Sequence, residues 1–286
     1  MNNSDIKDPI FLEAVEAIDS GNIIVLEKLI KEHPYLVKEK LATTKEGYFK
    51  DPYLLWFVAD NPIRIEKLPR NIVTVTRLLV DEVKQQSPDT AQQQIAYTLG
   101  LVATGRIPRE CGVQIEMMDL LMGAGAEPGG GLGALAHGNI EAAEHLINRG
   151  GKLTLPVAVG LKRKADINRL LPNANDKEKL TALTLAAFYG MTDMVSLLLK
   201  SGVNPNGYPH GDGFHHHATP LHQAVYSGSL EVVKLLIDAG ADLTATDKAY
   251  NGTPLGWAIY MQTEEGYDEA GKKRFAVIEK HLKEIS

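Results

Sequence analysis

The densest group of residues that could bind a metal ion lies near residue 210. Four histidines and one aspartate occur within eight positions: His210, Asp212, His215, His216 and His217. Imidazole and carboxylate groups are ligands that zinc takes. Adjacent histidines on an extended segment point to opposite sides, so at most two of the last three can join one site. No CxxC or HExxH pattern accompanies them. These histidines also suit a turn or a contact with a partner protein, without any metal. A metal- or small-ligand-binding sensor using residues 208–217 is therefore the alternative function rather than the first choice.

A glycine-rich segment, Gly129–Gly133, has the composition of a loop that binds phosphate. Such a loop follows a strand, and a P-loop also needs a Lys-Ser or Lys-Thr pair. Here a predicted helix precedes the glycines, and Ala134-Leu135-Ala136 follow them without that pair. The segment is better explained as a compressed connection between helical units. We expect no nucleotide and no other cofactor.

Catalytic groups are not indicated by residue spacing. No Ser/His/Asp arrangement and no paired-carboxylate motif is evident, although a site assembled from distant residues leaves no such pattern. The single cysteine, Cys111, has no partner for an intrachain disulfide, which fits a reducing cytosol. A packed or partly exposed thiol explains it better than a nucleophile. We expect a protein that is not an enzyme.

Charge and hydropathy exclude two further classes of function. A formal charge of −6 and a pI near 5.9 argue against nucleic-acid binding, which needs a basic surface. No run of 18 apolar residues predicts a membrane span, and the first eight residues lack the basic start and apolar stretch of a signal peptide. We expect a cytoplasmic protein that binds neither nucleic acid nor membrane.

The elements that position the candidate residues follow from an internal repeat. Three stretches align 38 and 34 residues apart: Thr181–Ala186, Thr219–Ala224 and Thr253–Ala258. Each predicts a first helix, and the first two are followed by amphipathic second helices over residues 193–202 and 231–240. In the middle copy Thr219 suits the N-cap, and Pro220 suits the first helical position, where its missing N–H costs nothing.

The middle copy carries the complete T-P-L-H-x-A pattern, and residues 228–242 continue it as Gly-Ser-Leu-Glu-Val-Val-Lys-Leu-Leu-Ile-Asp-Ala-Gly-Ala-Asp. In these residues the chain resembles the ankyrin-repeat family, whose period is about 33 residues. The resemblance implies helix pairs joined by short β-turn fingers and a rigid platform that binds proteins without cofactors. It also implies that His222 ties neighbouring repeats together through side-chain hydrogen bonds.

Weaker copies predict about eight helix pairs in one all-α ankyrin-repeat solenoid over residues 1–286. Irregular repeats occupy about residues 9–127, with helices expected at 11–18, 22–30, 54–59, 72–80, 92–103 and 117–126. Compressed repeats follow at about 128–178, spaced by about 25 residues and lacking the finger, and regular repeats at about 179–286. The charged helix near 272–284 suits a terminal capping repeat, which needs a polar outer face.

Aromatic residues near the end of each first helix are the candidate binding residues. In a regular stack, successive repeats lie about 10 Å apart, so Tyr189, Tyr226 and Tyr260 fall in or beside one column. Phe188, the residue before Tyr189, is also a candidate. The finger at residues 203–218 has five extra residues, and from it and the next finger three more side chains extend the column: Tyr208, Phe214 and Tyr250. His215 of the same finger is a further candidate partner-binding residue. The alternative is that these rings pack on the preceding finger and expose only an edge.

These observations predict a protein–protein interaction module. Clustered aromatic side chains are typical of interface hot spots, and exposed loops on a rigid scaffold are where recognition residues concentrate. We expect one partner protein, bound on the concave face centred on residues 188–260, and a monomeric chain. The compressed repeats and simple composition favour a stand-alone bacterial protein.

Overall fold

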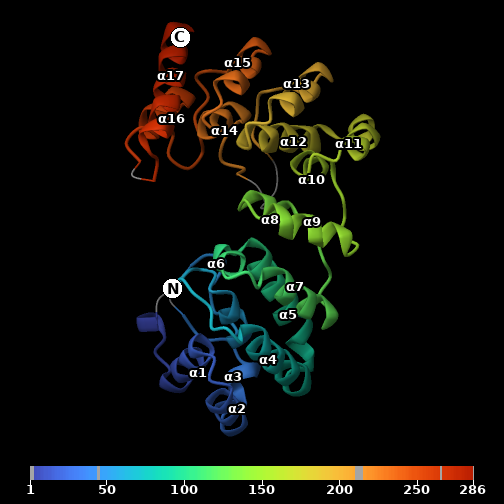
Figure 1. Ribbon diagram of the computed structural model, residues 1–286, viewed down its shortest axis with the longest axis vertical. Coiled ribbons are helices and arrows are strands. Elements are labelled where there is room, and N and C mark those ends of the chain that lie inside the picture. Colours follow the sequence, from blue (N-terminus) through green and yellow to red (C-terminus); the bar gives the residue numbers. More distant parts are fainter. Residues whose placement is uncertain (1–2, 44–45, 210–214, 265, 286) are drawn as a thin grey trace. The chain divides into compact units, whose positions relative to one another are not determined.

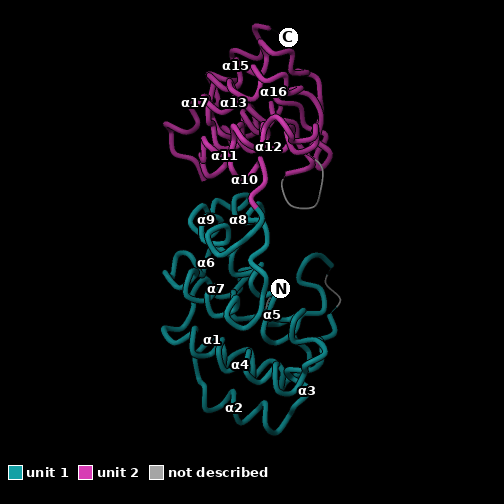
Figure 2. The backbone as a smooth tube through the Cα atoms, turned by 90° about the vertical axis from the view of Figure 1, so that its right-hand side faces the viewer, with its two compact units in different colours: residues 1–152 teal, residues 153–286 magenta. Residues whose placement is uncertain are grey.

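The computed structural model describes residues 3–43, 46–209, 215–264 and 266–285. Helices, turns and loops make up these segments, and no β-strand occurs within them, which confirms the all-α prediction. None of the described helices is long and apolar enough to cross a membrane. The chain divides into two compact units, residues 1–152 and residues 153–286 (Figure 2). The prediction of one continuous solenoid therefore stays a prediction.

Unit 1 contains irregular helix pairs. Its elements are η1 (Asn3–Asp5), α1 (Pro9–Ser20), α2 (Ile23–Glu32), α3 (Tyr35–Lys38), η2 (Leu54–Ala59), α4 (Ile72–Gln86), α5 (Pro88–Thr104), α6 (Arg106–Glu110), α7 (Gln114–Gly123), α8 (Leu132–Ala136) and α9 (Ile140–Asn148). Packing joins α1 to α2, η2 to α4, α5 to α7 and α8 to α9. Each helix expected in residues 9–127 is present, whereas the short helices α3 and α6 were not predicted.

The insertion between η2 and α4 is held by one buried arginine. Arg64 donates two hydrogen bonds to Asp19, at 2.7 and 2.9 Å, and its Nε lies 3.7 Å from Asp60. Asp60 in turn accepts the backbone N–H groups of Arg64 and Glu66. Buried charges are tolerated when paired and hydrogen-bonded, so this network fixes the irregular segment on the apolar core of unit 1.

Unit 2 contains four helix pairs (Figure 1). They are α10 (Leu155–Gly160) with α11 (Lys164–Leu170), α12 (Asp176–Phe188) with α13 (Thr192–Lys200), α14 (Pro220–Tyr226) with α15 (Leu230–Asp238), and α16 (Pro254–Tyr260) with α17 (Glu269–Ile285); the single turn η3 (Leu171–Asn173) follows α11. The first helices α10, α12, α14 and α16 pack successively, and so do α13, α15 and α17. Alanine, valine and leucine side chains fill the space between them.

Local capping explains where the first helices of unit 2 begin. Thr219 and Thr253 are the N-caps of α14 and α16, each followed by proline in the first turn. The aligned Thr181 differs, because it lies inside α12. That helix begins five residues earlier, at a capping box formed by Asn175 and Glu178, and no proline occurs at the aligned position to stop it.

His222 joins two successive repeats. Its Nδ1 lies 2.7 Å from the Thr219 hydroxyl, and its Nε2 lies 2.9 Å from the carbonyl oxygen of Gly252 in the next finger. The side chain is fully buried. This is the hydrogen-bonding role that the sequence pattern implied. Burial lowers the pKa of His222, although the Gly252 carbonyl and nearby Asp247 favour the charged form.

The lowered pKa of His222 predicts that acid destabilises the fold. As the pH falls below the ordinary value of 6.5, the unfolded chain takes up a proton that folded His222 does not, so the free energy of unfolding decreases. We expect the urea midpoint, followed by circular dichroism, to fall between pH 7.5 and 5.5. His222→Gln should lower the midpoint at pH 7.5 and weaken its pH dependence. Equal pH dependence in the wild type and His222→Gln would contradict this role.

Candidate protein-binding site

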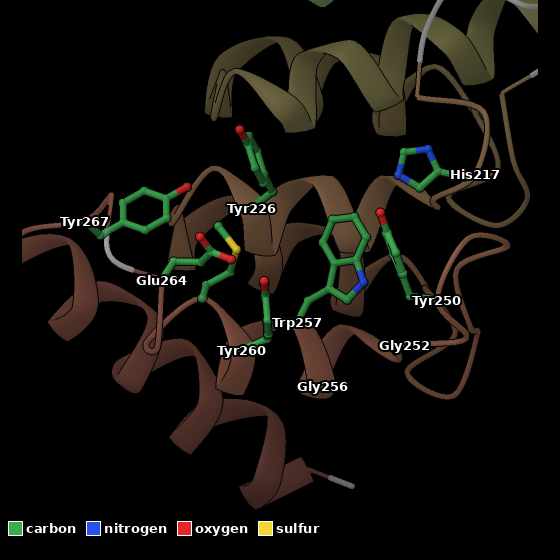
Figure 3. A pocket seen from close by; sticks show the side chains of 10 residues that line it. His217, Tyr226, Tyr250, Gly252, Gly256, Trp257, Tyr260, Glu264 and Tyr267 are labelled. Atoms are coloured by element: carbon green, nitrogen blue, oxygen red, sulfur yellow. The ribbon is translucent and has the colours of Figure 1, made fainter. Parts of the chain in front are cut away.

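A pocket of about 710 Å³ opens on unit 2 around the end of α14, helix α16 and the loops on either side of α16 (Figure 3). Its lining is dominated by aromatic side chains: His217, Tyr226, Tyr250, Gly252, Gly256, Trp257, Tyr260, Met261, Glu264 and Tyr267. Ligand-binding pockets have volumes of about 300–1,000 Å³ and apolar walls with a few polar groups. The pocket has the size and chemistry of a binding site.

Tyr226, the last residue of α14, forms one wall. The side chain is 41% exposed, and its ring stacks on Phe188 with centroids 5.3 Å apart and planes within 8°. Phe188 also contacts the rings of Tyr189, at 5.0 Å, and His215, at 4.8 Å. The half-buried Phe188 therefore holds Tyr226 in a fixed orientation beside the pocket.

The finger before α16 is organised by a buried carboxylate. Asp247 Oδ1 accepts the backbone N–H groups of Ala249, at 2.9 Å, and Tyr250, at 2.7 Å. Its Oδ2 accepts the N–H of Gly252 at 2.8 Å and the indole Nε1–H of Trp257 at 3.0 Å. Burial alone would raise the pKa of Asp247, but these hydrogen bonds hold it below its usual range. Asp247 thereby fixes both the finger and the indole ring.

The floor of the pocket is the ring of Trp257. It contacts the His222 ring at 5.1 Å and the His217 ring at 6.2 Å. Burial lowers the pKa of His217, with a smaller opposing effect from Asp247. Because its ordinary value is already 6.5, His217 is neutral at physiological pH. Tyr250, on the finger, is 84% exposed and extends the aromatic wall outward.

The loop after α16 supplies the opposite wall. Tyr260 is 61% exposed, and a hydrogen bond to Glu264 raises its pKa. Burial raises the pKa of Tyr267, with a further contribution from a hydrogen bond to Tyr226, and its ring rests on Phe275 at 5.0 Å. Figure 3 shows Tyr226, Tyr260 and Tyr267 around the same space. The loop thus folds back toward the end of α14.

The structure brings together three of the predicted binding residues, Tyr226, Tyr250 and Tyr260, in the pocket lining. Phe188, Tyr189 and His215 lie beside them in contact with one another rather than in the pocket. Whether these residues form the predicted aromatic column and bind a partner stays a prediction.

Tyr208 lies apart from the pocket. Its hydroxyl donates to the carbonyl oxygen of Thr246 at 2.6 Å, and Lys248 Nζ lies 4.2 Å from its ring centroid. This ring therefore packs on the next finger, whereas the alternative for the aromatic column had the rings pack on the preceding finger. Phe214 lies outside the described residues.

Trp257, Tyr267 and Glu264 were not predicted as site residues. Trp257 replaces the glutamine of the preceding repeat, and this aromatic substitution is the signal that the sequence offers. Tyr267 and Glu264 belong to the loop between α16 and α17. Nothing in their local pattern indicates that the loop turns back onto α14.

The histidine-rich finger shows no metal centre in its described part. His215 and His217 have ring centroids 5.9 Å apart, but no three His, Cys, Asp or Glu side chains of the described residues are arranged to bind a metal ion. His210 and Asp212 lie outside those residues. The metal-binding alternative gains no support from the structure.

Comparison with known proteins identifies the repeats in part of the chain. A model described as ankyrin repeats in three copies matches residues 132–247, which include α8 to α15. Residues 132–247 of the chain are therefore ankyrin repeats. The matched region ends at Asp247, so α16, α17 and much of the pocket lie beyond it. Ankyrin repeats in general mediate protein–protein interaction, and the family is typically non-catalytic.

Two relatives are similar to part of this chain. The inactive serine/threonine-protein kinase TEX14 of Bos taurus is 36% identical over 98 residues, which are 34% of this chain and 6% of that protein. The transient receptor potential cation channel subfamily A member 1 of Homo sapiens is 26% identical over 183 residues, covering 50% of this chain and 16% of the channel. The chain thus matches a small part of each relative's length.

Proposed function

We propose that this chain is a binding module that holds one partner protein in the aromatic pocket of unit 2. The observation that carries the proposal is the concentration of exposed tyrosines, Tyr226, Tyr250 and Tyr260, around one cavity. Large exposed apolar side chains that gather in one place are typical of interaction sites, and interface hot spots are enriched in tyrosine and tryptophan.

Rigidity of the pocket supports the proposal. Tyr226 is stacked on Phe188, and Trp257 is hydrogen-bonded to Asp247. Side chains that are already ordered lose less conformational entropy when a partner binds, so a preorganised surface binds more tightly. The binding face includes the first-helix ends and fingers of residues 188–260, which is the concave face expected from the repeat.

The remaining parts of the proposal follow from the sequence. The protein acts as a monomer in the cytoplasm, without a cofactor and without catalysing a reaction. It does not bind nucleic acid or a membrane, because its net charge of −6 opposes both anionic surfaces.

Affinity capture from the cytosol of the source organism tests this function. The bait is the wild-type chain, and the comparison bait carries both Tyr226→Ala and Tyr260→Ala. A Tyr48→Ala bait is the matched control, because Tyr48 is 58% exposed and lies in unit 1. We expect at least one protein that the wild type and the control retain and the double variant loses. Identical sets of proteins on all three baits would refute binding through this pocket.

A further inference from the structure

One acidic residue is among the described residues that line the aromatic pocket. Of the described residues that form its wall, Glu264 carries a carboxylate, whereas His217 is neutral because burial lowers its pKa. No lysine or arginine is among those lining residues. Buried Asp247 accepts a hydrogen bond from the indole of Trp257 and adds negative electrostatic potential on that side of the pocket. Arg274 interacts electrostatically with Tyr267 at the edge, outside the lining. The cavity therefore favours a positively charged occupant.

The aromatic walls favour the same charge. Four tyrosines and one tryptophan line the cavity: Tyr226, Tyr250, Trp257, Tyr260 and Tyr267. The face of an aromatic ring carries negative electrostatic potential, so a cation within about 6 Å of the ring centre is attracted to it, most strongly by tryptophan. A carboxylate beside several rings combines this attraction with an ion pair. The aromatic walls and the carboxylate together favour a cation that is planar and weakly hydrated.

We propose that the pocket binds an arginine side chain in an extended segment of the partner protein, an inference that rests on the proposed function. Guanidinium is planar, stacks on aromatic rings and pairs with carboxylates through two parallel N–H groups. The lysine ammonium is more strongly hydrated, so it gains less from aromatic walls. The volume of about 710 Å³ exceeds the need of one guanidinium and leaves room for flanking residues of a peptide.

Glu264 lies beside Tyr260 in the loop after α16, and its carboxyl group raises the pKa of the Tyr260 phenol. A carboxylate has about four acceptor positions, so the guanidinium N–H groups still find free lone pairs. Substitution Glu264→Gln keeps the shape and an acceptor for Tyr260 but removes the charge, which makes it a specific test.

Selection from a random 12-residue peptide library displayed on phage tests the inference. The baits are the full-length wild type, Glu264→Gln, and Glu231→Gln, whose side chain lies exposed on α15. Circular dichroism verifies that each variant is folded. We expect peptides selected on the wild type and on Glu231→Gln to share an arginine, and peptides selected on Glu264→Gln to lose this enrichment.

One selected peptide then serves in a double-substitution cycle measured by calorimetry. Replacing its arginine with citrulline, which is neutral and of the same shape, should weaken binding to the wild type about tenfold, and Glu264→Gln should weaken binding of the arginine peptide by a similar factor. The citrulline peptide should bind both proteins equally. Lysine in place of arginine should bind more weakly than arginine.

The outcomes separate the inference from the function on which it rests. Selected peptides that lack arginine, yet lose binding when Tyr226 and Tyr260 become alanine, would overturn the arginine inference and leave the protein-binding function intact. Lysine or a methylated lysine that binds more tightly than arginine would overturn the choice of cation. No enrichment of peptides on the wild type would overturn both the arginine inference and the proposed function. Peptide binding that is unchanged when Tyr226 and Tyr260 become alanine would also overturn both.

Discussion

Asp247→Ala is expected to lower the free energy of unfolding of unit 2 by about 3 kcal/mol or more. The carboxylate is fully buried and accepts four hydrogen bonds, three from the finger backbone and one from Trp257. Removing a buried acceptor leaves its donors unsatisfied at a cost of about 1–3 kcal/mol each, although such costs are not additive. Urea unfolding followed by circular dichroism measures the loss.

The matched control is Asp242→Ala. Asp242 belongs to the same finger and accepts two hydrogen bonds from Thr244, at 2.8 and 2.7 Å, but it is exposed. Water replaces those bonds, so the loss of stability should be much smaller than that caused by Asp247→Ala. Equal destabilisation by the two variants would contradict the role of Asp247 as the centre of the finger.

The stabilising contribution of Asp247 also depends on pH, because it requires the charged carboxylate. Its folded pKa lies below the ordinary value of 3.8. Its contribution to stability is therefore complete above that value and is lost as the pH falls through the folded pKa. The decrease in the free energy of unfolding between pH 7 and 5.5 is instead caused by His222 and His217, because both have pKa values below 6.5 in the folded chain.

The second large effect concerns binding. The double substitution Tyr226→Ala and Tyr260→Ala should weaken the affinity for the captured partner at least about a hundredfold, which is nearly 3 kcal/mol. Both rings are substantially exposed, so their removal should change the melting temperature by no more than a few degrees. Calorimetric titration of the partner measures the affinity, and differential scanning calorimetry measures the stability.

Tyr48→Ala is again the control for this measurement. Its hydroxyl donates to Asn61 at 3.0 Å in unit 1, so the substitution removes a tyrosine of similar exposure without touching the pocket. We expect wild-type affinity from it. A double variant that binds the partner within threefold of the wild type would show that the partner uses another surface.

Much of unit 2 was predictable because its signals are local. Thr219 and Pro220 determine where α14 begins, and the TPLH pattern placed the buried hydrogen bonds of His222. Helix capping depends on residues within one turn of each other, so it is visible in a single sequence. The same register placed Tyr226 and Tyr260 at the ends of successive first helices, where the structure has them.

The rest of the site depends on contacts between distant segments. Tyr267 reaches the pocket because its ring packs on Phe275 and its hydroxyl meets Tyr226, and neither contact leaves a periodic signal. In unit 1 the segment after η2 is shaped by the ion pair of Arg64 with Asp19, 45 positions apart. Long-range polar contacts of this kind were missed for the same reason.

Hydrogen–deuterium exchange measured by mass spectrometry, with and without the captured partner, tests the central claim most directly. The account predicts slower exchange on binding in the finger at 247–252, at the end of α14 and α16, and in the described parts of the loop at 261–268. Amides on the outer helices α13 and α15 should be unchanged. Protection confined to unit 1, or to those outer helices, would contradict binding in the aromatic pocket.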